Sequence, residues 1–198
     1  METQEKIDYK LVEAIPEIDS LIEIVKLLPP NPIIVEVGTF LGGTTVRLAE
    51  SRPDANITTV DPCNEPLNSD SNWVAPYGEY VRTYLVEKVL QGPITKLHLY
   101  NNISRFSNIK FVEGYSPECF QDWNTQIDLY FEDGNHFNPV LIKNLNFFKN
   151  FVKVGGYLAA HDYCDECPDV IVEIDKIIGH NWNKILLDRR LIVIQRVL

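Results

Sequence analysis

The stretch that decides the fold runs from Ile33 to Thr45 and reads IIVEVGTFLGGTT. Its first five residues form a nearly continuous apolar run, as expected of a strand that is buried on both faces. Gly38 ends this run, Gly42 and Gly43 follow, and a helical pattern begins at Thr44. A buried strand that passes through a glycine turn into a helix brings backbone close to a ligand at the carboxyl edge of a sheet. We therefore expect a ligand-binding turn after this strand.

Short apolar runs alternate with helical patterns along the rest of the chain. Further strands are expected at 56–60, 108–113, 127–132, 156–160, 185–187 and 191–194. Helices are expected at 18–28, 44–50, 117–123, 139–152 and 168–179. This alternation indicates an α/β fold with a mostly parallel sheet. The last two strands are too close together for a helical crossover, so we expect them to pair antiparallel.

The 198 residues are enough for one domain and too few for two, and no linker divides them. We therefore expect a single domain over 1–198, with 1–31 as an N-terminal helical cap. Residues 62–107 are far longer than an ordinary crossover and contain Trp73, Tyr77, Tyr80 and Tyr84. Such an insertion either forms part of a binding site, as a lid, or adds a packed helix pair, and these residues alone favour neither.

The composition and the N-terminal sequence indicate which kind of partner and which compartment to expect. Lys and Arg number 18 against 28 Asp and Glu, which gives a net charge of −10. This balance speaks against binding to nucleic acid or to an anionic membrane, and favours a small-molecule partner. The charged N-terminus leads into no apolar signal core, and no run approaches the roughly 18 apolar residues of a membrane span. We expect a cytoplasmic protein with reduced thiols.

Cysteines offer one further motif. Cys164 and Cys167 form a single C-x-x-C, without the second pair that a four-thiolate zinc site needs. The pattern favours incidental loop thiols over a redox or metal role.

Two carboxylates are expected beside the glycine turn. Asp61 follows the second strand, where it could accept hydrogen bonds from both hydroxyls of a ribose. Glu36 stands near the end of the first strand, where burying a carboxylate is costly without a partner, and a cationic ligand group would supply one. The glycine spacing is G-x-x-x-G-G and not G-x-G-x-x-G, which argues against a dinucleotide.

A second group of chemically active residues follows later strands. Asp133 and His136 come directly after the fourth strand, and His161 and Asp162 come after the fifth. In a parallel sheet these residues share one carboxyl edge with Gly38, so all of them can face a single crevice.

Three motifs together resemble the class I S-adenosylmethionine-dependent methyltransferases. They are the glycine turn with Asp61, the run Asp133-Gly134-Asn135-His136, and the run His161-Asp162-Tyr163. More narrowly, the chain is similar, over about 30–196, to the O-methyltransferases that act on sugar hydroxyls of macrolides and related glycosides. The resemblance implies a Rossmann-like fold: a mostly parallel seven-stranded sheet with an antiparallel last strand and helices on both faces. It also implies S-adenosyl-L-methionine as cofactor and a divalent metal, with Mg²⁺ expected and Mn²⁺, Fe²⁺ or Zn²⁺ as alternatives.

The resemblance also implies residue roles at the cofactor end. Glu36 would lie near the amino group of the cofactor, Asp61 would hold the ribose diol, and Ser116 would lie against the adenine. The full set of implied cofactor-binding residues is Glu36, Gly38, Thr39, Phe40, Gly42, Thr44, Asp61, Ser116 and Asp133. For Thr44 and Ser116, helix N-capping is an equally good interpretation.

At the reacting end, an alcohol holds its proton too tightly at neutral pH, so a base or a cation must help. The resemblance implies His136 as catalytic base, and Asp133, His161 and Asp162 as metal ligands. The resembling enzymes usually have a carboxylate at the position of His161, and Mg²⁺ prefers oxygen ligands. His161 is therefore a neighbour of a two-carboxylate site, a ligand of a softer metal, or part of a metal-free site.

Other functions fit parts of the pattern. An NAD-dependent oxidoreductase on a related fold would also use Asp61, and a catalytically silent binding module or a hydroxylase-type relative would share the sheet. We expect the acceptor to be a small molecule with a hydroxyl group. A homodimer is common among the resembling enzymes.

Overall fold

The structure is a computed structural model that describes residues 14–63 and 96–198. Most of the predicted insertion at 62–107, with its Trp73, Tyr77, Tyr80 and Tyr84, lies outside the described residues, as do 1–13 of the predicted cap. The remaining part of that insertion, from 96 on, is a helix that leads into the third strand.

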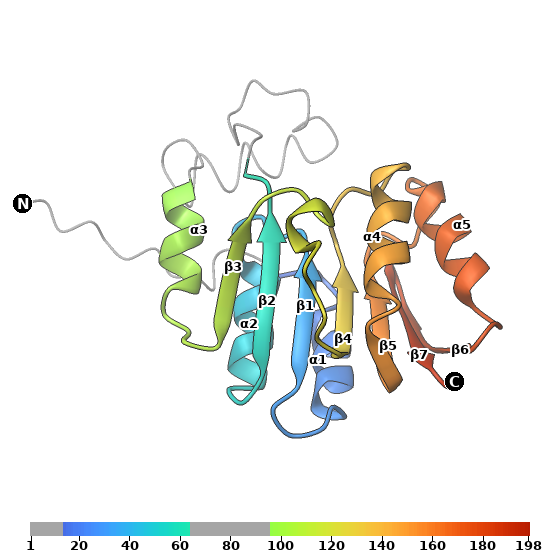
Figure 1. Ribbon diagram of the computed structural model, residues 1–198, viewed down its shortest axis with the longest axis horizontal. Coiled ribbons are helices and arrows are strands. Elements are labelled where there is room, and N and C mark those ends of the chain that lie inside the picture. Colours follow the sequence, from blue (N-terminus) through green and yellow to red (C-terminus); the bar gives the residue numbers. More distant parts are fainter. Residues whose placement is uncertain (1–13, 64–95) are drawn as a thin grey trace, which may run out of the picture.

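Within the described residues, seven strands form one sheet in the order β3-β2-β1-β4-β5-β7-β6 (Figure 1). The strands are β1 (Ile33–Val37), β2 (Asn56–Asp61), β3 (Ile109–Glu113), β4 (Ile127–Glu132), β5 (Val152–Ala160), β6 (Trp182–Asp188) and β7 (Leu191–Arg196). All neighbours are parallel except β7, which is antiparallel to both β5 and β6. The predicted mostly parallel sheet with an antiparallel last strand is confirmed.

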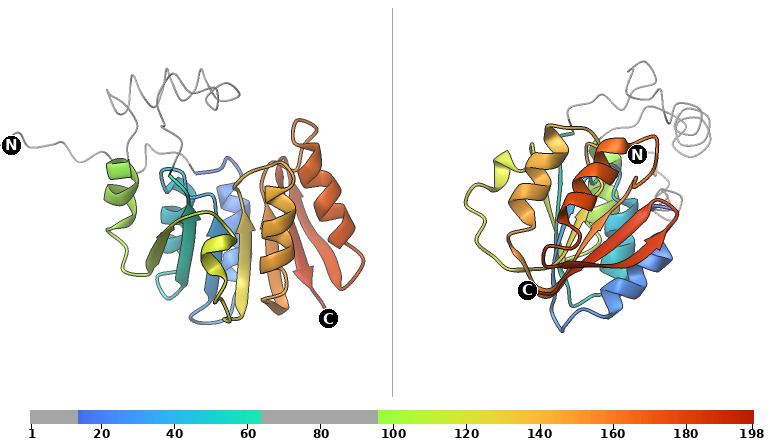
Figure 2. Two further views of the ribbon diagram at one scale, coloured as in Figure 1. Left: turned by 45° about the horizontal axis from the view of Figure 1, so that its top comes forward. Right: turned by 90° about the vertical axis from the view of Figure 1, so that its right-hand side faces the viewer.

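Helices cover both faces of this sheet. They are α1 (Ile18–Lys26), α2 (Gly43–Ser51), α3 (Lys96–Ile103), α4 (Val140–Phe148) and α5 (Pro168–Ile177), with a 3-10 turn η4 (Glu118–Phe120). Figures 1 and 2 show α4 and α5 on one face and α1 and α2 on the other. Among the described residues, no helix has both the length and the apolar character needed to cross a bilayer.

Two apolar layers hold the helices to the sheet. On one face, Val35 and Tyr130 pack with Phe148 of α4 and with α5. On the other face, Ile34 packs with Leu21 of α1 and with α2. Neighbouring residues of β1 therefore face opposite layers, which is why the strand reads as a continuous apolar run.

Several predicted element limits are wrong. The helix expected at 139–152 ends at Phe148, and Val152 already belongs to β5. The register of β5 shifts against β4 near Gly155, whose φ is +84°, so the first half of β5 lacks a normal strand pattern. The helix expected at 117–123 is only the 3-10 turn η4, and β6 begins at Trp182, three residues before the expected start.

The carboxyl ends of β1 to β5 meet at one edge of the sheet, the upper edge in Figure 1. Gly38, Asp61, Asp133 and His161 directly follow or end these strands, so the fold gathers them as predicted.

Candidate functional site

The turn after β1 is closely packed against the loop after β4. Gly38 has φ +96°, and a Cβ atom added there would lie 2.1 Å from the carbonyl oxygen of Asp133. The backbone N–H of Asp133 donates to the carbonyl of Val37 at 2.8 Å. Gly42, with φ +81°, then forms the N-cap of α2. Glycine at position 38 is therefore required both by its conformation and by its neighbour.

Asp61 organises the backbone around this turn. Its Oδ2 accepts a hydrogen bond from the N–H of Phe40 at 2.9 Å, and its Oδ1 accepts one from the N–H of Cys63 at 2.9 Å. A carboxylate oxygen has more than one acceptor site, so both oxygens keep capacity for ribose hydroxyls. The contact of Asp61 with a cofactor stays a prediction.

Glu36 is buried inside the same edge, with 1% of its surface exposed. Its Oε2 accepts hydrogen bonds from the hydroxyls of Thr45 and, at 2.6 Å, Thr59. The hydroxyl of Thr39 lies 2.6 Å from that of Thr59. Burial raises the pKa of Glu36 to about 8, although the two hydroxyls lower it in part. Its Oε1 is buried and has no hydrogen-bond partner among the described residues, as a site for a cationic ligand group requires.

The capping interpretations of Thr44 and Ser116 are both wrong. Gly42 is the N-cap of α2, and the Oγ1 of Thr44 instead accepts the N–H of Ile15 at 3.1 Å. Pro117 is the N-cap of η4, while the Oγ of Ser116 is buried without a hydrogen-bond partner in the described part of the chain. Ser116 therefore offers a free polar atom to a ligand, whereas the oxygen of Thr44 already bonds to the protein.

His161 lies among three carboxylates. Its Nδ1 is 3.2 Å from Oδ1 of Asp133 and 3.4 Å from Oδ2 of Asp162. Its Nε2 is 3.1 Å from Oε2 of Glu17, the buried residue that precedes α1. Burial lowers the pKa of His161, but the two aspartates outweigh it and raise this pKa to about 11. Without a metal, both ring nitrogens of His161 therefore carry a proton and the imidazolium is positively charged.

Asp162 connects this group to His136. Its Oδ2 is 3.2 Å from Nε2 of His136, and its Oδ1 is 3.2 Å from a guanidinium nitrogen of Arg190. Burial raises the pKa of Asp162, but His161, His136 and Arg190 together lower it to about 2. The side chain of His136 is 22% exposed, so this pair lies at the surface of the cluster. A histidine oriented by a buried carboxylate is the usual arrangement of a general base.

A buried network supports the loop that carries Asp133. Glu132 accepts hydrogen bonds from the hydroxyl of Tyr130, from the N–H of Gly134 at 3.2 Å and from the side chain of Asn144 at 3.4 Å. Burial raises the pKa of Glu132 to about 8. Glu132 thus bonds to the backbone of Gly134 and holds the loop that follows β4 in place.

Asp133, His161 and Asp162 could hold a metal ion. Each offers one ligand atom, and the three atoms lie within 4.8 Å of one another. Two carboxylate oxygens and one imidazole nitrogen form a donor set that divalent cations such as Mn²⁺ and Fe²⁺ accept, and the oxygens also suit Mg²⁺. The residues therefore fit the implied metal.

Sequence reasoning missed several residues of the site. Glu17 and Arg190 reach His161 and Asp162 from distant parts of the chain, so no local pattern marks them. Thr45 and Thr59 carry a signal, because each stands on an element that flanks the strand of Glu36, but hydroxyls at such positions are common in any sheet. All four cysteines are free, and burial raises the pKa of the Cys167 thiol to about 11, which makes it a poor nucleophile.

The strand order, the glycine turn after β1 and the acidic residue at the end of β2 define a class I S-adenosylmethionine-dependent methyltransferase fold. Residues 35–163 match the model of the methyltransferase domain family Methyltransf_24, and the chain belongs to this family. This membership favours a methyltransferase over the alternative of an NAD-dependent oxidoreductase.

Individual relatives are distant. Protein R132 of Acanthamoeba polyphaga mimivirus, described as uncharacterized, is 25% identical over 147 residues, which are 73% of this chain. The chain spans 58% of the length of that relative. The solved structure of the O-methyltransferase NovP has a TM-score of 0.62 at 16% identity, covering 92% of this chain and 80% of NovP.

A second solved structure contains a ligand. The Streptococcus mutans protein SMU.1697c, described as a methyltransferase in complex with SAH (S-adenosylhomocysteine), has a TM-score of 0.59 at 12% identity. The match covers 93% of this chain and 99% of that protein. Other structures with this fold are described as rRNA and precorrin methylases, so the fold alone does not select the methyl acceptor.

Proposed function

We propose that this protein is an S-adenosylmethionine-dependent O-methyltransferase that acts on a hydroxyl group of a small molecule, of sugar or natural-product type. The observation that carries the proposal is the direct contact between the glycine turn and the loop of Asp133. That contact brings the turn expected to hold the cofactor next to the cluster of His136, His161 and Asp162. An activated methyl group and a proton-accepting group thus belong to one edge of the sheet.

His136 is the proposed base. The acceptor hydroxyl gives its proton to the imidazole while its oxygen attacks the methyl carbon of the sulfonium. The carbon–sulfur bond breaks, its electron pair stays on sulfur, and the products are the methyl ether and S-adenosylhomocysteine. Because Nε2 of His136 faces Asp162, Nδ1 is the nitrogen available to the hydroxyl. Asp162 orients the ring and stabilises the imidazolium that forms.

At the cofactor end, two buried polar atoms that have no hydrogen-bond partner within the described part of the chain support the assignment. Oε1 of Glu36 would receive the α-ammonium group, and Oγ of Ser116 would lie at the adenine. Asp61 would accept the ribose hydroxyls, and Gly38, Thr39, Phe40 and Gly42 would line the turn. Thr44 is the weakest member of this set, because Ile15 already uses its oxygen.

A divalent cation would be held by Asp133, His161 and Asp162, with Mg²⁺ as the expected ion and Mn²⁺, Fe²⁺ or Zn²⁺ as alternatives. When bound, it would lower the pKa of the acceptor hydroxyl. His161 must lose its proton to serve as a ligand, so the cation would replace that proton between the two carboxylates.

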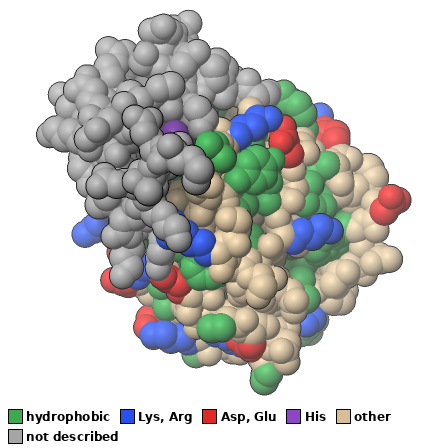
Figure 3. Space-filling view, turned by 90° about the vertical axis from the view of Figure 1, so that its left-hand side faces the viewer, with side chains coloured by type: hydrophobic (Ala, Val, Ile, Leu, Met, Phe, Trp, Pro, Cys, Tyr) green, Lys and Arg blue, Asp and Glu red, His purple; other side chains and the backbone are tan. Residues whose placement is uncertain are grey.

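The charge distribution supports a small-molecule acceptor over a nucleic acid. The net charge is −10. On the side of the molecule where α3 and β3 lie, the basic and acidic side chains of the described residues are interspersed and do not form the basic surface that binding to a phosphate backbone needs (Figure 3). We also propose a homodimer in a reducing compartment such as the cytoplasm. The four free cysteines support the proposal of a reducing compartment.

Calorimetric titration with S-adenosylhomocysteine tests the cofactor, and a panel of glycosides, phenols and polyketides with labelled S-adenosylmethionine tests the acceptor. We expect saturable binding at one site per chain and label transfer to a hydroxyl oxygen. A chain that is folded but does not bind S-adenosylhomocysteine would refute the proposal.

A further inference from the structure

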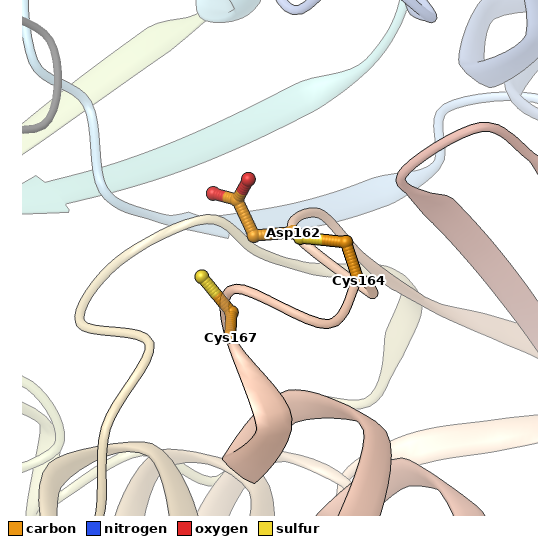
Figure 4. Close-up of side chains that lie close together, drawn as sticks. All are labelled: Asp162, Cys164 and Cys167. Atoms are coloured by element: carbon orange, nitrogen blue, oxygen red, sulfur yellow. The ribbon is translucent and has the colours of Figure 1, made fainter.

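Two cysteines of the loop between β5 and α5 lie beside Asp162. Asp162, Cys164 and Cys167 each offer one ligand atom, and all three atoms lie within 4.8 Å of one another. In Figure 4 the sulfur atoms of both cysteines lie toward the carboxylate of Asp162. The run D-x-C-x-x-C therefore supplies from one short loop the third ligand that a single C-x-x-C lacks.

We propose that this loop binds a thiophilic divalent cation of the zinc type, through the two sulfurs and one carboxylate oxygen. Zinc in proteins is commonly held by thiolate and carboxylate ligands in a tetrahedron, and three protein ligands leave the fourth position to water. Thiolates select zinc over magnesium, so this site differs in metal preference from the set of Asp133, His161 and Asp162.

Backbone hydrogen bonds already hold the loop in the form that such a site needs. The N–H of Cys164 donates to the carbonyl of Asp162 at 2.8 Å, and the N–H of Cys167 donates to the carbonyl of Cys164 at 2.9 Å. The N–H of Tyr163 donates to the carbonyl of Arg190 at 2.9 Å, which ties the loop to the β6–β7 turn. Ligands fixed by the fold lose little conformational freedom when a cation binds.

The accessibility of the three side chains suits an ion that enters from solvent. Asp162 and Cys167 are buried, at 2% and 8% exposure, whereas Cys164 is half-buried. The ion would therefore meet Cys164 first and be enclosed by the other two.

The surrounding charges partly compensate one another. Two thiolates and one carboxylate carry three negative charges, of which a divalent cation neutralises two. The guanidinium of Arg190, 3.2 Å from Oδ1 of Asp162, supplies the remaining positive charge. A second nitrogen of Arg190 lies 3.4 Å from Glu166 of the same loop. The guanidinium thus offsets part of the negative charge that remains at the buried carboxylate of Asp162 once a cation is bound.

The site shares Asp162 with the pair that we assign to catalysis. Oδ2 of Asp162 lies 3.2 Å from Nε2 of His136. Occupation of the thiolate site therefore fixes the carboxylate that orients His136. The cation site itself stands on the loop geometry and does not depend on the proposed methyl transfer.

Cobalt(II) reports directly on thiolate ligands, because sulfur-to-cobalt charge transfer absorbs in the near ultraviolet. We would titrate the reduced, metal-free full-length chain with Co²⁺ without oxygen. The expected result is charge-transfer absorbance that saturates at one ion per chain and disappears when Zn²⁺ is added. Absence of this absorbance overturns the proposal. So does a Cys164–Cys167 disulfide that, once reduced, leaves thiols that take up no metal.

Variants identify the ligands. Cys164→Ser and Cys167→Ser should each lower cobalt affinity by about 100-fold or more, beyond the roughly 10- to 100-fold cost of losing a residue that only supports a ligand. Asp162→Asn should weaken binding and keep the charge-transfer absorbance. Cys119→Ser removes an exposed thiol elsewhere and should bind as the wild type. If Cys119→Ser and Cys167→Ser lowered the cobalt affinity equally, the assignment of the ligands would be contradicted.

A measurement on the unaltered chain covers the case in which a variant does not fold. Zn²⁺ should protect Cys164 and Cys167 from alkylation, as read by peptide mass spectrometry, while Cys119 is alkylated with or without the ion. Protection of all or none of the cysteines overturns the proposal. Titration of Cys167→Ser with S-adenosylhomocysteine separates the two proposals, since we expect normal nucleoside binding without cobalt binding.

Discussion

Gly38 and Asp133 are in direct backbone contact, so close that a Cβ atom on Gly38 would lie 2.1 Å from the Asp133 carbonyl oxygen. The strands that precede them pair side by side, and the N–H of Asp133 bonds to the carbonyl of Val37. This contact fixes the distance between the turn that we assign to the cofactor and the loop that carries the acid–base residues. No side chain can be placed between them without moving backbone.

Gly38→Ala should therefore both destabilise the fold and weaken cofactor binding. An L-residue in the left-handed region costs about 1–2 kcal/mol, and the clash with Asp133 adds to this cost. We expect the free energy of unfolding to fall by at least about 2 kcal/mol, measured by urea unfolding. The affinity for S-adenosylhomocysteine, measured by calorimetry, should fall with it.

Gly179→Ala is the matched control. Gly179 follows α5 with φ +89°, and a Cβ atom there would meet nothing within 4 Å. This variant therefore bears the conformational cost alone and should keep normal nucleoside affinity. Equal losses of stability in the two variants would show that the contact with Asp133 is unimportant.

Glu36 should make the stability of the cofactor-free protein fall with rising pH. Its ordinary pKa is 4.5, and burial raises it to about 8 in the folded chain. The stability that this group contributes is full below its unfolded pKa and is lost as pH rises towards 8. The slope is at most about 1.4 kcal/mol per pH unit for one proton. Glu36→Gln should flatten that part of the curve between about pH 5 and 8.

Urea unfolding across that pH range provides the measurement. Glu132, whose pKa is also raised to about 8, adds a similar slope to both proteins and cancels in the difference. Glu23→Gln, at an exposed position of α1, is the control. Its free energy of unfolding should change with pH at the same slope as that of the wild type. The same slope in wild type and Glu36→Gln would mean that Glu36 is ionised throughout.

The sheet and its active edge could be predicted because their signals are local. The apolar run of β1 and its end at Gly38 follow from burial on both faces, and the parallel topology then gathers strand ends at one edge. Asp133 and His161 could be placed at that edge from their strands alone. Their contact at 3.2 Å is consistent with that placement.

Other parts of the site depend on tertiary contacts that no local pattern reveals. Glu17 lies 144 residues from His161 in the sequence, and Arg190 reaches Asp162 from the β6–β7 turn. The early start of β5 was missed because the shifted register near Gly155 disrupts the pattern of a regular strand. The sequence predicts incidental thiols at Cys164 and Cys167, and the metal role that we propose for them depends on Asp162 as a third neighbour, which a search for a second cysteine pair does not find.

His136→Ala should abolish most of the turnover and leave nucleoside binding intact. A positioned general base typically contributes about 10²- to 10⁴-fold to the rate, so we expect kcat to fall within that range. The affinity for S-adenosylhomocysteine should be unchanged, because His136 pairs with Asp162 and is not among the residues that we assign to the cofactor. His180→Ala, at an exposed position before β6, should behave as the wild type. Methylation at the normal rate by His136→Ala would remove this residue from the mechanism.

The hard-cation site should be detectable without any assay of activity. Mn²⁺ titrated into the metal-free chain should lose its free-ion electron paramagnetic resonance signal as it binds to Asp133, His161 and Asp162. Asp133→Asn should abolish this binding, whereas Asp122→Asn, at an exposed position after η4, should not affect it. Methyl transfer should stop in chelator and return with Mg²⁺ or Mn²⁺, ions that thiolates bind poorly. If chelator leaves the rate unchanged, protonated His161 itself supplies the positive charge between the two aspartates, and the reaction needs no metal.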